Sequence, residues 1–536
     1  MKKLLLFCVL LFSSYLFSQE DAWVILKDKP SASNYLSNPL TMLSQRSLDR
    51  RTKQKIALDE KDVPVHSSYY NQIKGADGIT VLAKSKWLNA IHIRGEKSKI
   101  DALKTTFNFI DKIEFANRSL NARTTVSTKK VKASHYNKFS SVKEDFNYGL
   151  TSSQITMIKA DFLHKKGFTG KGMQIAVIDA GFPNVNILSA FKRIRDNNKI
   201  LGGYDFVNRS TNFYSGHNHG TNVLSDISGY IKDQFVGTAP DASFYLFITE
   251  DVSNEGPLEE SLWVEAAERS DSLGVDVINT SLGYTTFDNA NYSHTYADMD
   301  GKTAFISRGA EIGVSRGMIL VTSAGNDGNK SWKYISAPAD AASVFTIGAV
   351  DATETIASFS SFGPTADGRV KPDVLAHGRN VYVINHQTGI PSTSNGTSFS
   401  SPVMAGAVAS FWQAFPSKTN VEIMNMIRES ADKYSNPTNQ YGYGVPDLEQ
   451  AYNKTLSSED NDKEEFKIFP NPVNDHLIIS FTDTINEVIV YSVLGQEVYK
   501  NISNSNIINV SSLNKGVYIL QIKSGRKIEK IKFIKK

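Results

Sequence analysis

Short apolar runs alternate with amphipathic stretches through the middle of the chain, from about residue 149 to residue 452. The runs have the length and the Val and Ile content of buried strands. They fall at residues 174–178, 244–248, 275–279, 318–322 and 344–348, and the helical stretches fall near residues 258–272 and 303–316. Such alternation predicts right-handed crossovers and a parallel sheet covered by helices on both faces. We therefore expect an α/β domain here.

The pattern changes on both sides of this domain. Residues 20–120 mix strand-like segments with a helix-like segment at 100–106, which predicts a small α+β domain. Residues 466–536 carry short alternating segments, such as 476–481, 487–491 and 516–522, which predict a small β-sandwich. The chain is thus expected to fold as three domains.

Two polar segments separate these domains. Residues 121–148 are rich in Ser, Thr, Lys and Asn, a composition typical of an exposed, protease-sensitive linker. The acidic residues 456–465 predict a second linker, so the middle domain is expected to span residues 149–455.

A long apolar run opens the chain. Two lysines precede apolar residues 4–17, a run that is too short to cross a membrane but fits a secretory signal peptide over residues 1–19. The sole cysteine, Cys8, lies in this run, so the mature protein would contain no disulfide. No other window is apolar enough to span a bilayer. We expect an exported protein without a transmembrane segment after signal removal.

The charge balance is close to neutral. The chain has 59 Lys and Arg residues against 55 Asp and Glu residues, which gives no reason to expect a nucleic-acid partner or an acidic membrane surface.

Three short segments of the middle domain carry candidate chemistry. Asp179 ends an apolar strand-like run and precedes a glycine turn, and carboxyl ends of parallel strands are where sites form in open sheets. His219, in the segment GHNHGT, precedes a helix-like stretch at 222–230. Ser398, in the segment NGTSFSSP, enters the helix-like stretch 403–415, where backbone N–H groups favour developing negative charge.

Each segment has an ordinary explanation when it is taken alone. Asp179 and Ser398 are residue types that cap turns and helices. His219 could be a surface histidine, and His217 adds the His-x-His spacing of a metal site. The joint occurrence in the order Asp, His, Ser, with the local glycines, is the arrangement found in subtilisin.

Residues 149 to about 452 resemble the peptidase domain of the subtilase family. Besides the three segments, residues 277–283 resemble the family segment whose backbone pairs with an extended substrate, and residues 323–326 resemble the segment that supplies an oxyanion-hole amide. Residues 361–373 resemble the stretch that precedes the serine. The sequence departs from the family pattern at Asn222, where a second histidine is usual, and at His377, where a proline is common.

The resemblance implies a serine endopeptidase that cleaves proteins and peptides through an acyl-enzyme. Asp179, His219 and Ser398 would form the catalytic triad, and Asn326 would contribute to the oxyanion hole. The implied substrate-binding residues are Ser281, Leu282, Gly283, Ser323, Ala324 and Gly325. The chemistry would require no cofactor.

Family members often bind structural Ca²⁺. The acidic loop with Asp288, Asp298 and Asp300 offers oxygen donors, without the regular spacing of a calcium loop.

The flanking domains carry resemblances of their own. The front domain resembles the inhibitory propeptide of exported subtilases, which would assist folding, leave its tail in the active-site cleft and be cut away between Asn117 and Tyr148. The end domain resembles the C-terminal sorting domain of the type IX secretion system of Bacteroidota. The expected partners are protein substrates, the protein's own propeptide and the type IX machinery, and the expected location is outside the cell or on its outer surface.

Two rival interpretations belong to other classes. A catalytically inactive protein could use the same scaffold to bind partners at the cell surface. Alternatively, Asp179, His217 and His219 could hold a hydrolytic metal, although that scheme leaves the Ser398 segment without a role.

Overall fold

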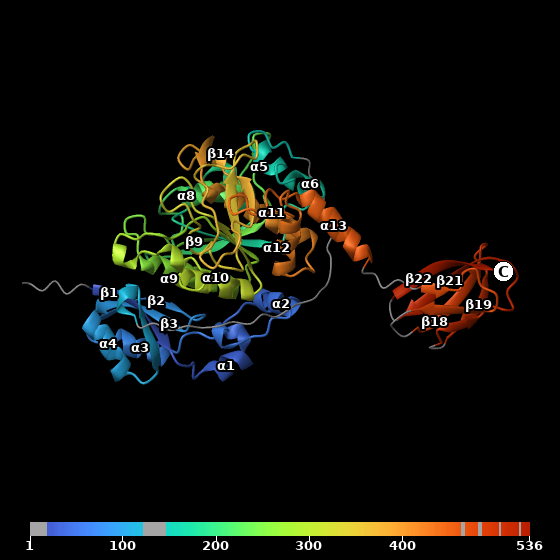
Figure 1. Ribbon diagram of the computed structural model, residues 1–536, viewed down its shortest axis with the longest axis horizontal. Coiled ribbons are helices and arrows are strands. Elements are labelled where there is room, and N and C mark those ends of the chain that lie inside the picture. Colours follow the sequence, from blue (N-terminus) through green and yellow to red (C-terminus); the bar gives the residue numbers. More distant parts are fainter. Residues whose placement is uncertain (1–18, 122–145, 462–466, 481–484, 503–504, 525–526) are drawn as a thin grey trace, which may run out of the picture. The chain divides into compact units, whose positions relative to one another are not determined.

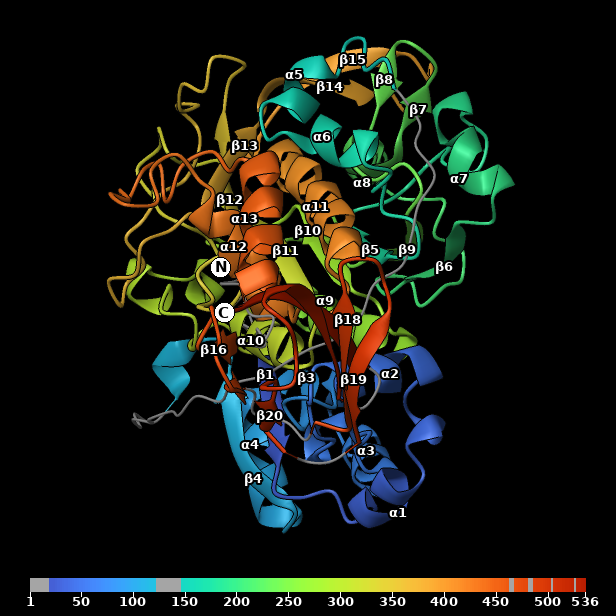
Figure 2. The same ribbon diagram turned by 90° about the vertical axis from the view of Figure 1, so that its right-hand side faces the viewer.

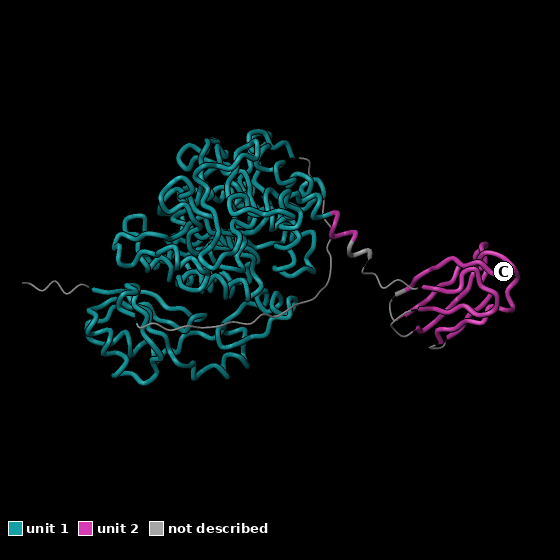
Figure 3. Tube along the Cα trace, in the orientation of Figure 1, with its two compact units in different colours: residues 1–452 teal, residues 453–536 magenta. Residues whose placement is uncertain are grey.

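The computed structural model describes residues 19–121, 146–461, 467–480, 485–502, 505–524 and 527–536. It divides into two compact units, residues 1–452 and 453–536 (Figure 3). Residues 1–18 of the predicted signal peptide and residues 122–145 of the predicted linker lie outside the described residues.

A seven-stranded parallel sheet forms the centre of the first unit, as the alternating pattern predicts. Its strands are β5 (Gln174–Asp179), β6 (Ile200–Asp205), β9 (Ser243–Ile248), β10 (Val277–Thr280), β11 (Ile319–Ser323), β12 (Phe345–Val350) and β13 (Val374–His377). They lie in the order β13-β12-β11-β10-β5-β9-β6, and each pairs with its neighbours in parallel. The connections diverge on either side of β5, so the carboxyl end of this strand lies at a topological switch point, where sites form in such sheets.

Helices cover both faces of this sheet (Figures 1 and 2). On one side lie α8 (His219–Ser228) and α11 (Thr397–Ala414), and on the other lie α9 (Pro257–Leu273) and α10 (Phe305–Ser315). The ends of α9 follow from its sequence, because Pro257 occupies the first turn and Gly274 adopts a left-handed φ of 87° just beyond the last. The unit also contains α5 (Ser152–Thr156), α6 (Ala160–Lys165), α7 (Lys192–Asp196), α12 (Asn420–Glu429), and the short strands β7 (Tyr230–Ile231), β8 (Phe235–Val236), β14 (Arg379–Ile384) and β15 (Pro391–Asn395).

The front domain is a four-stranded antiparallel sheet on which α3 (Ser67–Lys74) and α4 (Lys97–Thr106) pack. The strands β1 (Gln19–Leu26), β2 (Ile79–Ser85), β3 (Ala90–Glu96) and β4 (Ile110–Phe115) lie in the order β2-β3-β1-β4. The helices are α1 (Ala32–Ser37), α2 (Gln45–Lys53), α3 (Ser67–Lys74) and α4 (Lys97–Thr106). Alternate strand residues, such as Val24, Ile91 and Ile93, are fully buried in its core. This is the small α+β domain that the sequence predicts.

The second unit contains two antiparallel sheets. One consists of β16 (Lys467–Phe469), β17 (His476–Ser480) and β20 (Ile507–Asn509), and the other of β18 (Glu487–Ser492), β19 (Glu497–Asn501), β21 (Gly516–Ser524) and β22 (Lys527–Lys535). A shared core of alternating apolar residues, including Leu477, Val490 and Leu520, lies between the sheets, as in a sandwich. No helix among the described residues is long and apolar enough to cross a membrane.

The predicted linker at residues 456–465 differs from the structure. Helix α13 (Leu448–Asn461) continues through its first six residues. Leu448, Ala451 and Thr455 are buried and anchor the start of the helix. Adding residues to an existing helix is much easier than starting one, so the acidic composition does not end it.

Candidate active site

Asp179 and His219 meet at the carboxyl end of the central strand. Asp179 is the last residue of β5 and is 1% exposed, and His219 is the first residue of α8. The imidazole Nδ1 lies 2.8 Å from Asp179 Oδ1 and 3.1 Å from Oδ2. A carboxylate can only accept here, so Nδ1 carries the proton and the lone pair of Nε2 is free.

A glycine allows this close approach of helix and strand. A Cβ atom on Gly220 would lie 2.4 Å from the carbonyl oxygen of Gly181 and 2.9 Å from Cβ of Asp179. Any other residue after His219 would therefore push α8 away from β5. This explains in physical terms why the motif continues from the histidine with glycine.

The carboxylate also sets the charge state of the imidazole. Burial disfavours the charged ring, but the negative charge of Asp179, its hydrogen bond and the charge of Glu250 outweigh this effect. The pKa of His219 is therefore raised above its ordinary value of 6.5. The site is built to stabilise an imidazolium.

Ser398 lies in the first turn of α11, and the helix begins at Thr397, six residues before the predicted stretch. The side-chain hydroxyl donates a 3.2 Å hydrogen bond to the backbone carbonyl of Ser281. The next residue, Phe399, has its ring centroid 5.7 Å from that of the His219 imidazole. The structure thus brings the nucleophile candidate and the imidazole to the same edge of the sheet.

Asn326 borders the same region from the loop after β11. Its Oδ1 accepts a 2.9 Å hydrogen bond from the backbone N–H of Thr397, which turns the Nδ2 group the other way. A Cβ atom on Gly396 would lie 3.5 Å from this Nδ2 and 3.6 Å from the backbone nitrogen of Ser398. The Asn326 Nδ2 and Ser398 backbone nitrogen atoms therefore both border the small space that Gly396 leaves open.

The predicted substrate-binding residues follow two adjacent parallel strands. Ser281, Leu282 and Gly283 come directly after β10, and Ser323, Ala324 and Gly325 end or follow β11. Gly283 is exposed, whereas Ser281, Ser323 and Ala324 are buried. The two segments therefore offer mainly backbone groups to a ligand.

The residues that the metal and calcium hypotheses name as ligands make hydrogen bonds within the protein. His217 is exposed, and its Nδ1 accepts a 3.3 Å hydrogen bond from the backbone of His219. The carboxylates of Asp298 and Asp300 accept backbone N–H groups within their own loops, and the Asp288 carboxylate accepts the backbone N–H of Glu255 from another loop. Among the described residues, no three His, Cys, Asp or Glu side chains are grouped so as to hold a metal ion. We assign no calcium site to these loops.

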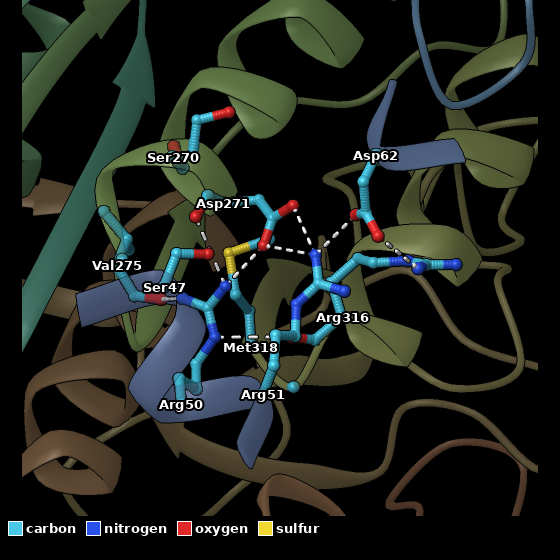
Figure 4. A network of polar contacts seen from close by, with 12 residues as sticks. Ser47, Arg50, Arg51, Asp62, Ser270, Asp271, Val275, Arg316 and Met318 are labelled. Carbon is cyan, nitrogen blue, oxygen red and sulfur yellow. Dashed lines mark hydrogen bonds and ion pairs between the residues drawn. The ribbon is translucent and has the colours of Figure 1, made fainter. Parts of the chain in front are cut away.

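The front domain packs on α9 through a buried network of charges (Figure 4). Arg50 and Arg51 of α2 both contact the Asp271 carboxylate of α9, with 2.7 Å between Arg51 Nη2 and Oδ2. Arg51 also binds Asp62 of its own domain at 2.9 Å, and Asp62 faces Arg316 of the middle domain at 3.5 Å. The Asp271 carboxylate is fully buried, and the two arginines outweigh burial and hold the pKa of Asp271 below its ordinary value.

The sequence analysis did not identify three residues that make these contacts at the candidate site and at the interface with the front domain. It gives Arg50, Arg51 and Thr397 no role. The partners lie 220 residues away in the case of Arg51 and Asp271, and 71 residues away in the case of Thr397 and Asn326. No local pattern could indicate such pairs.

Comparison with protein families decides the identity of the middle domain. Residues 170–444 match the model of the subtilase family, Peptidase S8. The chain belongs to the subtilase family. It is therefore a serine-type endopeptidase, and the parallel sheet agrees with that fold.

Two curated relatives agree with this assignment. The subtilase is 28% identical over 331 residues to serine protease AprX of Bacillus subtilis (strain 168), covering 56% of this chain and 71% of the relative. It is 30% identical over 305 residues to Subtilisin Savinase of Lederbergia lenta, covering 55% of this chain and 97% of the relative. The solved MycP3 protease from the type VII (ESX-3) secretion system covers 58% of this chain and 91% of its own, at 19% identity and a TM-score of 0.46.

Two further family models match the flanking domains of the subtilase. Residues 21–134 match the Peptidase S8 propeptide domain of Bacteroidota, and residues 467–536 match the secretion system C-terminal sorting domain. Both expected resemblances are confirmed. The sorting domain indicates type IX secretion, which delivers this serine protease to the cell surface or the extracellular space.

Proposed function

We propose that this subtilase cleaves peptide bonds through an acyl-enzyme formed on Ser398, with His219 as general base and Asp179 as its orienting carboxylate. The observation that carries the proposal is the 2.8 Å hydrogen bond between His219 Nδ1 and Asp179, since it fixes the tautomer that leaves Nε2 free to take a proton. The raised pKa of His219 supports the same role, because the imidazolium formed in the reaction is stabilised.

The reaction would proceed in two steps. Ser398 Oγ attacks the substrate carbonyl while His219 accepts its proton, and the imidazolium then protonates the leaving amine. In the second step water gives a proton to the same histidine and attacks the acyl carbon, and the imidazolium then protonates Ser398 Oγ as the bond from Oγ to the acyl carbon breaks. For the first step, the hydroxyl turns from the Ser281 carbonyl toward His219, a rotation about one side-chain bond.

The oxyanion of the tetrahedral intermediate would lie in the space beside Gly396, facing Asn326 Nδ2 and the Ser398 N–H. We expect Asn326→Ala to lower kcat by roughly 10²- to 10³-fold. KM should change little, whereas the melting temperature should fall somewhat, because the buried N–H of Thr397 loses its acceptor, Asn326 Oδ1. The measurement is steady-state hydrolysis of a chromogenic peptide, with the exposed loop variant Asn329→Ala as control. An Asn326→Ala enzyme with wild-type kcat would remove Asn326 from the mechanism.

The pH profile should report the raised pKa of His219. The base must be neutral to act, so activity is lost as pH falls through this pKa. We expect the acidic limb of kcat/KM to have its midpoint above 6.5, because the negative charge of Asp179 outweighs burial. His217→Ala should leave the midpoint in place. A midpoint at or below 6.5 in the wild-type enzyme would contradict the role given to the carboxylate.

We also propose that the front domain inhibits the enzyme until it is removed. The packing of the front domain against α9 supports this role, as does the composition of residues 121–148, which suits a cleavable linker. The predicted position of its tail in the active-site cleft concerns residues outside those described. The proposed boundaries are residues 20–120 for the propeptide, 149–455 for the peptidase domain and 466–536 for the sorting domain, whose proposed partner is the type IX machinery.

The inactive-scaffold alternative has less support. Each position that the family uses for catalysis is filled by the expected residue type, and the Asp179 and His219 side chains are hydrogen-bonded to each other as the mechanism requires. A scaffold freed from catalysis would not need the pairing of Asn326 with Thr397.

A further inference from the structure

The nucleophile helix contains a proline that leaves one backbone group without its usual partner. In an α-helix, the carbonyl of residue 398 would accept a hydrogen bond from the N–H of residue 402. Residue 402 is a proline inside α11 and has no N–H. Because Ser398 is 8% exposed, its carbonyl needs another donor.

Ser281 supplies that donor from outside the helix. Its hydroxyl donates a 2.9 Å hydrogen bond to the Ser398 carbonyl. In return, the Ser281 carbonyl accepts the Ser398 hydroxyl at 3.2 Å. The two serines are 117 residues apart in sequence, and the pair of bonds fastens the start of α11 to the end of β10.

A buried amide fixes the direction of the Ser281 hydroxyl. Asn279 Nδ2 lies 2.9 Å from Ser281 Oγ, and Ser401 Oγ lies 3.0 Å from Asn279 Oδ1. The Ser281 hydrogen is already engaged by a carbonyl, so Ser281 Oγ must accept and the amide nitrogen must face it. Asn279 and Ser401 are both fully buried. The chain of bonds therefore has one consistent orientation.

We propose that Asn279 and Ser281 form a positioning relay for the nucleophile, in which the Ser281 hydroxyl replaces the helix hydrogen bond that Pro402 cannot make. The relay fixes the orientation of the peptide group that follows Ser398. It thereby fixes the direction of the Cα–Cβ bond of Ser398. Ser281 thus acts through its side chain on Ser398, in addition to the backbone pairing with substrate that the family resemblance implies. The inference rests on the proposed function, because it takes Ser398 as the nucleophile.

The first test removes the hydroxyl. Ser281→Ala should lower kcat and the rate of labelling by a fluorophosphonate about tenfold, the effect of losing one buried hydrogen bond. KM should stay unchanged, because the backbone that meets the substrate is intact. Ser281→Thr keeps the hydroxyl and should retain most activity. Ser400→Ala is the matched control, since this buried serine of the same turn bonds only within the helix, to the Thr397 carbonyl.

The second test restores the missing donor. Pro402→Ala supplies an N–H at the position where the helix would use it, so the double variant Ser281→Ala/Pro402→Ala should regain most of the lost kcat. A merely structural role of Ser281 in packing would give no such rescue. Ser281→Cys, which keeps the volume but donates weakly, should follow Ser281→Ala and decides the question if the alanine variant does not fold.

The outcomes separate the relay from the proposed function. If the wild-type enzyme is neither labelled nor active, the proposed function fails. If the wild-type enzyme is labelled but Ser281→Ala matches it, or Pro402→Ala gives no recovery, the relay is wrong while Ser398 keeps its role.

Discussion

Ser398→Ala should reduce casein hydrolysis by roughly 10⁶-fold, the loss that follows removal of a triad nucleophile. In the proposed mechanism Ser398 alone forms the acyl-enzyme, so its loss would leave only the proposed oxyanion donors. The variant should also stay at precursor length if maturation is autocatalytic. The measurements are a casein digestion assay and mass spectrometry of the purified chain, with Ser400→Ala as the control.

The wild-type chain should carry a new N-terminus between Asn117 and Tyr148. A mature N-terminus at Gln19 to Asp21 would contradict the removal of the front domain. Casein hydrolysis by Ser398→Ala at the wild-type rate would contradict the triad itself, whatever the N-terminus.

Asp271→Ala should strongly destabilise the precursor. The substitution leaves Arg50 and Arg51 buried without their shared carboxylate, and breaking a buried ion pair on one side costs about 3–5 kcal/mol. The measurement is urea unfolding of the uncleaved Ser398→Ala precursor, followed by tryptophan fluorescence.

The control for this variant is Asp196→Asn, which removes an exposed carboxylate paired with Lys192 one helical turn away. Such pairs contribute little to stability. Equal unfolding midpoints for Asp271→Ala and Asp196→Asn would show that the buried network does not hold the front domain.

Much of the sheet and of the candidate site could be predicted because their signals are local. A buried parallel strand is a continuous apolar run, so β5 is visible in the sequence together with the carboxylate that ends it. The close contact of α8 with β5 requires a glycine directly after His219. This glycine helps to recognise the histidine from a short segment of sequence. Taken with the order of the three segments, such local signals suffice to propose Asp179, His219 and Ser398 as the site from the sequence.

Helix starts were predicted less well, for a physical reason. The first two turns of α11 contain Thr, several Ser and Pro402, residue types that are also typical of loops. The prediction therefore starts this helix at Val403 instead of Thr397. In the structure, a hydrogen bond from outside the helix replaces one that Pro402 cannot donate. The Ser281 hydroxyl supplies it to the Ser398 carbonyl.

Contacts between distant segments could not be predicted at all. Asp271 is one of several carboxylates on α9, and nothing near it in the sequence distinguishes it from a solvated surface residue. Its partners Arg50 and Arg51 belong to another domain. Periodicity shows which face of a helix is polar, but it does not show which other segment covers that face.

The most direct test of the account is to label the purified, processed enzyme with a fluorophosphonate and to identify the modified residue by peptide mass spectrometry. We predict a single adduct on Ser398, absent from Ser398→Ala and slowed when His219 is replaced by alanine. A processed, folded enzyme that digests casein without labelling, or an adduct on a different serine, would contradict the central claim.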